Sequence, residues 1–280
     1  MTGPLVLKLG GELLESPADR DRLAAVAGGI AQQRPLVLVH GGGRAVDAEL
    51  DRRGIAPKKV DGLRVTDRAT LDAVVSVLAG VSNTEFVAAL VGQGVPAVGL
   101  TGVDAGLGRA ERARAHRSTS GAVVDLGFVG DPSDVDVSLL ELLLVHGYVP
   151  VVASIGLEAE GSALLNVNAD VMACRVAAAL DGADLVIAGG TPGVLDAKGD
   201  TIPALDAEAI DAAVTSGTAT AGMIAKLSAC RAALLEGVGS IRIVDGRMFD
   251  PMHGIDDAPG TTLTVGTGGL NPGGYVQRAS

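Results

Sequence analysis

The sequence contains few aromatic residues and few cysteines. Of its 280 residues only 2% are aromatic, and tryptophan is absent. The core must therefore be aliphatic and finely packed, which favours an α/β fold over an aromatic-rich all-β fold. The two cysteines, Cys174 and Cys230, lie in apolar helix-like stretches without a CxxC motif or a paired histidine spacing. We expect buried free thiols and no metal site built from protein ligands.

Positive charge is also scarce. The chain has 22 Lys and Arg residues against 33 Asp and Glu, a formal net charge of −11. This balance repels polyanions, so we expect no nucleic-acid partner, whereas a small anionic substrate needs only a few local cations. The N-terminus lacks the pattern of a signal peptide, and no apolar run appears long enough to span a membrane. We expect a cytoplasmic protein with no membrane partner.

Glycine is abundant, with 40 residues. Short apolar runs bounded by glycine or proline alternate with segments of helical periodicity, which predicts a mainly parallel sheet covered on both faces. The predicted strands lie near residues 4–7, 35–40, 97–100, 149–152, 185–187 and 241–244. The predicted helices lie near residues 19–32, 44–50, 67–90 with a break at Gly80, 136–146, 168–180, 206–216 and 222–235.

Four segments depart from this alternation. Residues 108–130 are polar and predict antiparallel strands or a flap at the sheet edge. Residues 58–65 predict a hairpin with an Asp61-Gly62 turn. Residues 191–200 predict a loop, and the chain from about residue 266 predicts a flexible tail.

Two strand-glycine-helix turns occur in the first fifty residues. The first strand ends in Lys8-Leu9-Gly10-Gly11, and the second ends in His40 followed by three glycines at 41–43. A lysine beside bare backbone N–H groups is a means of holding phosphate. Paired glycines also end strands for steric reasons, but the repetition points to one anion site built from both turns.

Three further segments carry candidate site residues, each with a structural alternative. In Asn166-Val-Asn-Ala-Asp170, Asn168 is placed to cap a helix and Asp170 to complement its dipole, or Asn166 binds a carboxylate while Asp170 orients lysines. Lys226 is either a solvated lysine or a nucleotide-phosphate contact. Arg64 suits bidentate binding of a carboxylate or a surface ion pair.

The ordered set of motifs resembles the amino acid kinase family, over residues 4 to about 265. Within that family it is most similar to the branch that phosphorylates N-acetyl-L-glutamate. The motifs are Lys-Leu-Gly-Gly at 8–11, His-Gly-Gly-Gly at 40–43, Gly-Leu-Arg-Val-Thr at 62–66, Asn-Val-Asn-Ala-Asp at 166–170 and Gly-Met-Ile-Ala-Lys at 222–226.

The resemblance implies a three-layer αβα sandwich with two lobes, in a homodimer. The lobe at 1–167 would bind the acyl amino acid and dimerise, and the lobe at 168–280 would bind nucleotide. Lys8 and Lys226 would stabilise the transferring phosphoryl group, held by Asp170. The substrate-binding residues would be Gly42, Gly43, Arg64 and Asn166. The phosphate- and nucleotide-binding residues would be Gly10, Gly11, Gly190, Thr191, Gly193, Leu195, Thr218 and Thr220.

The implied reaction uses ATP, with Mg²⁺ held mainly by the nucleotide phosphates, and belongs to arginine biosynthesis. A glutamate side chain, with an ordinary pKa of about 4.3, is ionised at neutral pH and needs no general base. The absence of a triad or metal spacing among His40, His116, His146 and His253 agrees with this, and we interpret all four as structural.

Some positions depart from the family pattern. Gly190 stands where relatives usually carry an acidic residue, which bears on nucleotide binding. The chain starts at its first strand, so we expect a homodimer insensitive to arginine. Two alternatives are a kinase for carrier-bound aminoadipate or glutamate in lysine biosynthesis, against which the net charge counts weakly, and a non-catalytic ligand-binding member of the fold.

Overall fold

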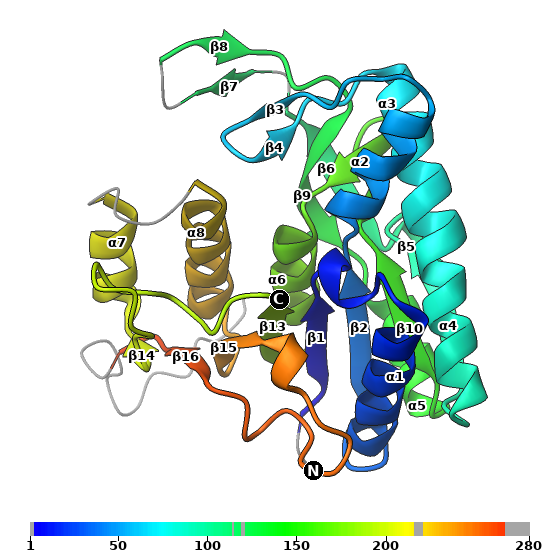
Figure 1. Ribbon diagram of the computed structural model, residues 1–280, viewed down its shortest axis with the longest axis vertical. Helices are drawn as coiled ribbons and strands as arrows, with labels where there is room; N and C mark the ends of the chain where they lie inside the picture. The colour runs from blue at the N-terminus through cyan, green and yellow to red at the C-terminus, as the bar shows by residue number, and fades with distance from the viewer. Residues whose placement is uncertain (1–2, 114, 119–120, 216–220, 267–280) are drawn as a thin grey trace, which may run out of the picture.

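The protein is described by a computed structural model over residues 3–113, 115–118, 121–215 and 221–266. Figure 1 shows a central sheet with helices on both faces and two hairpins projecting beyond one end of it. The predicted tail lies largely outside the described residues, as do the predicted nucleotide contacts Thr218 and Thr220.

The central sheet runs in the order β14-β16-β15-β13-β1-β2-β10-β5 and is mainly parallel. Of its described pairings, β15 with β16 is antiparallel. All six predicted strands are confirmed. The strands are β1 (Leu5–Leu9), β2 (Leu36–His40), β5 (Ala97–Thr101), β10 (Val149–Ala153), β13 (Asp184–Gly189), β14 (Ala204–Leu205), β15 (Ile241–Asp245) and β16 (Gly260–Leu263).

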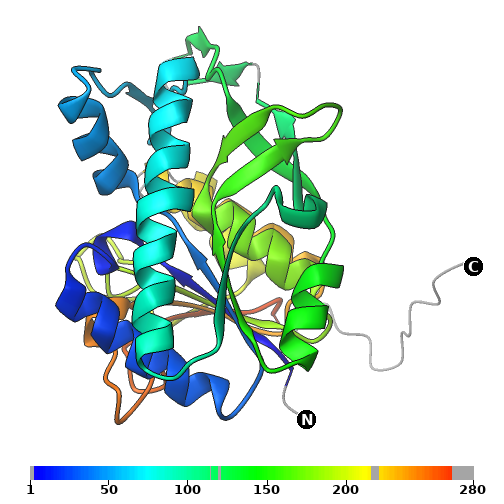
Figure 2. The same ribbon diagram turned by 90° about the vertical axis from the view of Figure 1, so that its right-hand side faces the viewer.

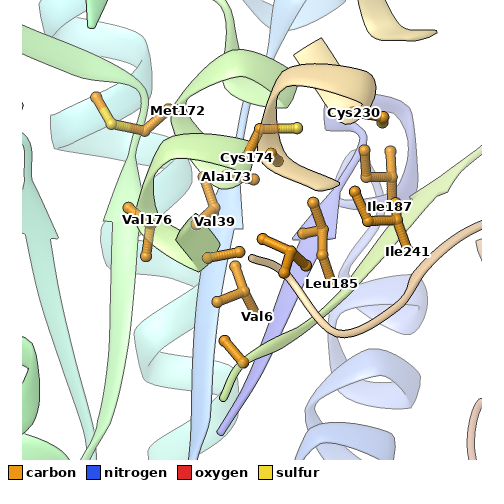
Figure 3. Packing of buried hydrophobic residues seen from close by; sticks show 14 of the residues in the cluster. Val6, Val39, Met172, Ala173, Cys174, Val176, Leu185, Ile187, Cys230 and Ile241 are labelled. Atoms are coloured by element: carbon orange, nitrogen blue, oxygen red, sulfur yellow. The ribbon is translucent and has the colours of Figure 1, made fainter. Parts of the chain in front are cut away.

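Helices cover both faces of this sheet, which confirms the predicted three-layer αβα sandwich. Side chains alternate along each strand, so Leu5 and Leu7 pack into one core and Val6 into the other. Helices α1 (Pro17–Ala31) and α4 (Asn83–Gly92) cover the first face. The second face is covered by α5 (Ser138–Val145), α6 (Ala169–Ala179), α7 (Ala207–Thr215) and α8 (Ala221–Leu235). Figure 3 shows Val6, Val39, Leu185 and Ile187 of the sheet beside Ala173, Cys174 and Val176 of α6.

The segment predicted at the sheet edge forms a separate structure. Strands β6 (Gly108–Arg112) and β9 (Val129–Val135) are antiparallel, as predicted, but they close a small four-stranded sheet with β11 (Ile155–Glu158) and β12 (Leu164–Val167). The edge strands of the main sheet are β14 and β5 instead. Between β6 and β9, the short strands β7 (His116–Arg117) and β8 (Val123–Val124) form a hairpin.

The predicted hairpin at 58–65 is confirmed. Strands β3 (Lys59–Val60) and β4 (Leu63–Arg64) pair antiparallel. The two turn residues, Asp61 and Gly62, have φ of 50° and 82°. Positive φ at both central positions is what a two-residue hairpin of this kind requires, which explains the Asp-Gly sequence.

The predicted helix break at Gly80 is wrong. Helix α3 (Arg68–Val75), the π-helical segment Ser76–Ser82 and α4 form one continuous helix, which runs the height of the molecule in Figure 2. A glycine inside a helix costs only about 1 kcal/mol relative to alanine, and burial of Val77 and Leu78 outweighs that. This π segment packs against α2 (Gly43–Arg52).

This long helix also corrects the expectation that no segment reaches membrane-spanning length. It has 25 residues, with an 18-residue window of mean hydropathy 1.7, of which 33% is buried within the protein. Phe86 and Leu90 are fully buried in the core beneath the sheet. The apolar composition therefore serves packing on one side of the helix, and it leaves apolar side chains exposed on the other.

The two cysteines are free and buried, as predicted. The fold brings them together, since Cys174 on α6 and Cys230 on α8 belong to facing helices (Figure 3). A hydrogen bond with Cys230, together with burial, raises the pKa of the Cys174 thiol well above its ordinary value. Thiols in such surroundings are unreactive, so their role is packing.

His40 and Asn83 form a buried polar pair that joins β2 to the long helix. Asn83 donates to the Val151 carbonyl at 2.9 Å and lies 3.1 Å from His40 Nε2, while His40 Nδ1 lies 3.0 Å from the Gly41 carbonyl. The geometry fits a neutral imidazole that donates from Nδ1 and accepts at Nε2. Burial lowers the pKa of His40, despite the opposing hydrogen bond to Gly41.

Protonation of His40 should therefore destabilise the fold. Below the ordinary histidine pKa of about 6.5, the unfolded chain binds a proton that the folded protein does not, so the free energy of unfolding falls as pH falls. We expect urea unfolding between pH 7.5 and 5.5 to show this loss, approaching roughly 1.4 kcal/mol per pH unit. His40→Gln should flatten the profile. An equal slope in the variant would contradict the assignment.

Candidate active site

One carboxylate holds two lysines at the centre of the molecule. Lys8 lies on β1, Asp170 in the first turn of α6, and Lys226 on α8. Lys8 Nζ is 2.7 Å from Asp170 Oδ1, and Lys226 Nζ is 2.5 Å from Asp170 Oδ2. The exposed fractions of the three side chains are only 10%, 15% and 14% for Lys8, Lys226 and Asp170. The sequence motifs predicted this grouping, and the fold assembles it.

The start of α6 explains why Asp170 sits where it does. Asn168 caps the helix, with its Oδ1 accepting from the Asp170 N–H at 2.8 Å. Burial alone would raise the pKa of Asp170, but the charges and hydrogen bonds of Lys8 and Lys226 hold it well below its ordinary value. The three groups therefore carry one net positive charge, screened little by water, which favours an anion beside them.

The two glycine turns are in direct contact beside this triad. A Cβ on Gly11 would lie 2.4 Å from the Gly42 Cα, and one on Gly42 would lie 2.6 Å from Leu78 of the π segment. At Gly10 a Cβ would lie 2.4 Å from the Glu12 carboxylate. The steric interpretation of these glycines is therefore correct. It also supports the anion-site interpretation, because the close contact places both turns beside the same site.

A cleft of about 510 Å³ opens over the triad and the glycine turns. It unites residues from both halves of the sequence. Eight of the predicted site residues line it: Lys8, Gly10, Gly11, Gly42, Gly43, Arg64, Asn166 and Asp170. Lys226 reaches this group through Asp170.

Arg64 and Asn166 both line the cleft. Arg64 Nη1 is 2.5 Å from Asp47 Oδ1, and its Nη2 donates to the Gly43 carbonyl at 3.0 Å. Asn166 donates to the Thr66 hydroxyl at 3.1 Å, and that hydroxyl donates to the Arg64 carbonyl. The sequence predictions missed Asp47 and Thr66, which orient the two predicted ligands. Asp47 lies one helical turn after Gly43, and this spacing was the sequence feature that could have placed it near the site.

Four of the predicted nucleotide-binding residues follow β13 along the chain. Gly193 has φ of 126°, and a Cβ there would lie 2.6 Å from the Thr261 hydroxyl, which accepts from the Val194 N–H. Leu195 is 45% exposed. The described residues that line the cleft do not include Gly190, Thr191, Gly193 or Leu195.

The described residues contain no group of three or more His, Cys, Asp or Glu side chains placed to hold a metal ion. The Asp170 carboxylate, which lines the cleft, is paired with two lysines.

The fold and the site together define the class of protein. The chain belongs to the amino acid kinase family, whose model matches residues 3–245. Within this family, the chain is similar to relatives named acetylglutamate kinase. The one from Chloroflexus aurantiacus is 42% identical over 266 residues, covering 95% of this chain and 98% of the relative. The one from Symbiobacterium thermophilum is 43% identical over 252 residues, covering 87% and 84%.

Solved structures agree with this assignment. The protein smu.665 from Streptococcus mutans UA159 has a TM-score of 0.78 at 26% identity, covering 95% of this chain and 100% of that one. N-acetylglutamate synthase from Neisseria gonorrhoeae, complexed with coenzyme A and N-acetyl-glutamate, has a TM-score of 0.79 at 26% identity. It covers 94% of this chain and 59% of that one.

The contact between the glycine turns should be sensitive to a single methyl group. Gly11→Ala places a Cβ against backbone of the second turn, so we expect a loss of about 1–3 kcal/mol in unfolding free energy, as for overpacking, together with a loss of anion binding. Gly43→Ala is the matched control, since a Cβ there meets nothing within 4 Å. Thermal unfolding of the two variants checks this. Equal melting temperatures would show that the turns are not in contact.

Proposed function

We propose that the protein catalyses the ATP-dependent phosphorylation of the side-chain carboxylate of N-acetyl-L-glutamate, giving N-acetyl-L-glutamyl 5-phosphate. The observation that carries this proposal is the Asp170-held lysine pair in a cleft that also contains Arg64 and Asn166. The relatives named acetylglutamate kinase support the same acceptor. The reaction implied by that name belongs to arginine biosynthesis.

The chemistry brings one anion up to another. The attacking carboxylate is already ionised at neutral pH, so the enzyme must position it and neutralise charge rather than remove a proton. Lys8 and Lys226 lie on opposite oxygens of Asp170. This geometry fits two cations that stabilise charge spread over the transferring phosphoryl group.

Each end of the acceptor has a proposed binding group. The guanidinium of Arg64, only 8% exposed, and the amide of Asn166 would bind the α-carboxylate. The N–H groups of Gly10, Gly11, Gly42 and Gly43 would approach substrate and γ-phosphate. We assign acceptor binding to residues 1–167 and nucleotide binding to residues 168–280.

ATP would bind near residues 190–195, with Thr218 and Thr220 as further contacts. Mg²⁺ bound to the phosphates would offset part of their charge. Since Asp170 is paired with both lysines, the nucleotide itself would supply most of the metal ligands. Dependence on ATP favours a cytoplasmic location.

A coupled assay of ATP consumption tests the proposal. We expect turnover with N-acetyl-L-glutamate and little with glutamate, aspartate or carbamate. Lys8→Ala should lower kcat by about 10²–10³-fold, the usual effect of removing one charge-stabilising group. Lys198→Ala, in an exposed loop, is the control and should change nothing. Absence of turnover with any acyl amino acid would refute the function, and preference for free glutamate would place the chain in another branch.

We also propose that the protein is a homodimer. The long helix, helix α5 and the turn that follows α5 carry exposed apolar side chains on the side of the molecule where the main sheet ends in β5. These are Val81 and Val91 at 56%, Leu142 at 57%, Val145 at 82% and Tyr148 at 42%. Single exposed apolar residues are common, but several gathered near an unpaired strand edge favour association with a second copy.

Val91→Glu should disrupt this association. A charge buried at an apolar interface has no partner, so we expect the variant to shift toward monomer in sedimentation measurements while keeping its far-UV circular dichroism. Val123→Glu, on the distant β7–β8 hairpin, is the control. A wild-type protein that sediments as a monomer at micromolar concentration would rule the homodimer out.

A further inference from the structure

The Glu12 carboxylate lies between two segments that are remote in sequence. It follows the first glycine turn, and its side chain folds back over Gly10, where it takes the space that a Cβ would fill. Its Oε1 accepts a hydrogen bond from the Gly190 N–H at 2.9 Å. Glu12 also lines the cleft over Lys8 and Asp170. One side chain thus lines the cleft that contains Lys8 and Asp170 and also contacts the start of the loop after β13.

The opposite side of Gly190 is held by a second charged group. Arg247 Nη2 donates to the Gly190 carbonyl at 2.8 Å. The same guanidinium is paired with Asp245, through Nη2 to Oδ2 at 2.6 Å and Nε to Oδ1 at 2.9 Å. The hydrogen bond from Arg247 helps to hold the pKa of Asp245 below its ordinary value. Asp245 ends β15, the strand next to β13.

Gly189 and Gly190 need external support. Neither has a side chain, so ordering this pair costs more backbone entropy than ordering any other residue type. Hydrogen bonds in which one partner is ionised are roughly twice as strong as neutral ones. Glu12 and Arg247 supply one such bond to each side of Gly190, and they reach it from the carboxyl ends of the strands that flank β13.

We propose that Glu12 is a positioning residue for the nucleotide loop, residues 190–195. By accepting the hydrogen bond from the Gly190 N–H, Glu12 would fix the orientation of this loop. This inference rests on the proposed function, which puts ATP beside that loop. Glu12 acts through the loop and does not itself bind the acceptor.

The space between Gly10 and Gly190, which the Glu12 carboxylate fills, accommodates one carboxylate. A Cβ on Gly190 would lie 3.7 Å from Glu12 Oε1 and 3.9 Å from its Cγ, with no closer neighbour. An aspartate at position 190 would therefore direct its own carboxylate against that of Glu12. Two like charges in one small space repel, so an acid at 190 and Glu12 should exclude each other.

Calorimetric titration of the full chain with MgADP tests the proposal, because it measures nucleotide binding without turnover. We expect Glu12→Ala to weaken MgADP binding by about 10-fold or more, in line with loss of one charge-assisted hydrogen bond. Glu12→Gln keeps an oxygen acceptor but not the charge, so it should lose clearly less affinity than Glu12→Ala. Glu15→Ala, which removes the same charge three residues later, should bind like the wild type.

Kinetics separate positioning from a merely structural role. Glu12→Ala should raise KM for MgATP while leaving KM for N-acetyl-L-glutamate within about twofold. Gly190→Asp should weaken nucleotide binding, and combining it with Glu12→Ala should recover affinity relative to Gly190→Asp alone.

Unchanged MgADP affinity in a folded Glu12→Ala protein would overturn the proposal, as would equal loss in Glu12→Ala and Glu12→Gln. If the wild type binds MgADP without phosphorylating any acyl amino acid, the proposed function fails, while the role of Glu12 is still decided by the titration.

Discussion

The double ion pair of Asp170 is the interaction on which the site depends. Two lysines from distant parts of the chain converge on one buried carboxylate. Breaking a buried ion pair by removing one partner is costly, on the order of 3–5 kcal/mol, because the remaining charge is left uncompensated. Asp170 therefore ties β1, α6 and α8 together while it keeps both ammonium groups beside the cleft. Structural and chemical roles fall on the same atoms.

The constraint continues into the glycine turns. The chain turns directly after β1, which carries Lys8. Backbone of the second turn lies so close to Gly11 that a side chain there would collide with it. Leu78 closes the other side of Gly42 from the π segment. A protein with net charge −11 thus has a site that is locally cationic and lined by backbone, and such a cleft favours a small anion.

The sequence was a good guide where periodicity and turn chemistry are local. It predicted six of the eight strands of the main sheet, but not β14 and β16, and it predicted the helix cap at Asn168 and the Asp61-Gly62 hairpin. It failed at Gly80, where tertiary packing outweighs glycine's low helix propensity. Pairing between Asp170 and Lys226 spans 56 residues, so only the family resemblance indicated it. Glu12 carried no signal at all, because a glutamate in a polar turn has the pattern of a solvated side chain. Its contact with Gly190 appears only when β1 and β13 lie side by side.

The central claim is that Lys8 and Lys226 together hold a phosphoryl group in transfer. The most direct measurement is a crystal structure with ADP, Mg²⁺, N-acetyl-L-glutamate and aluminium fluoride, a planar mimic of that group. We predict the fluoride plane between the two lysine Nζ atoms, with both lysines still contacting Asp170 and the acceptor carboxylate in line with ADP. An aluminium fluoride group bound away from the lysines, or an acceptor outside the cleft that contains Arg64, would contradict the account.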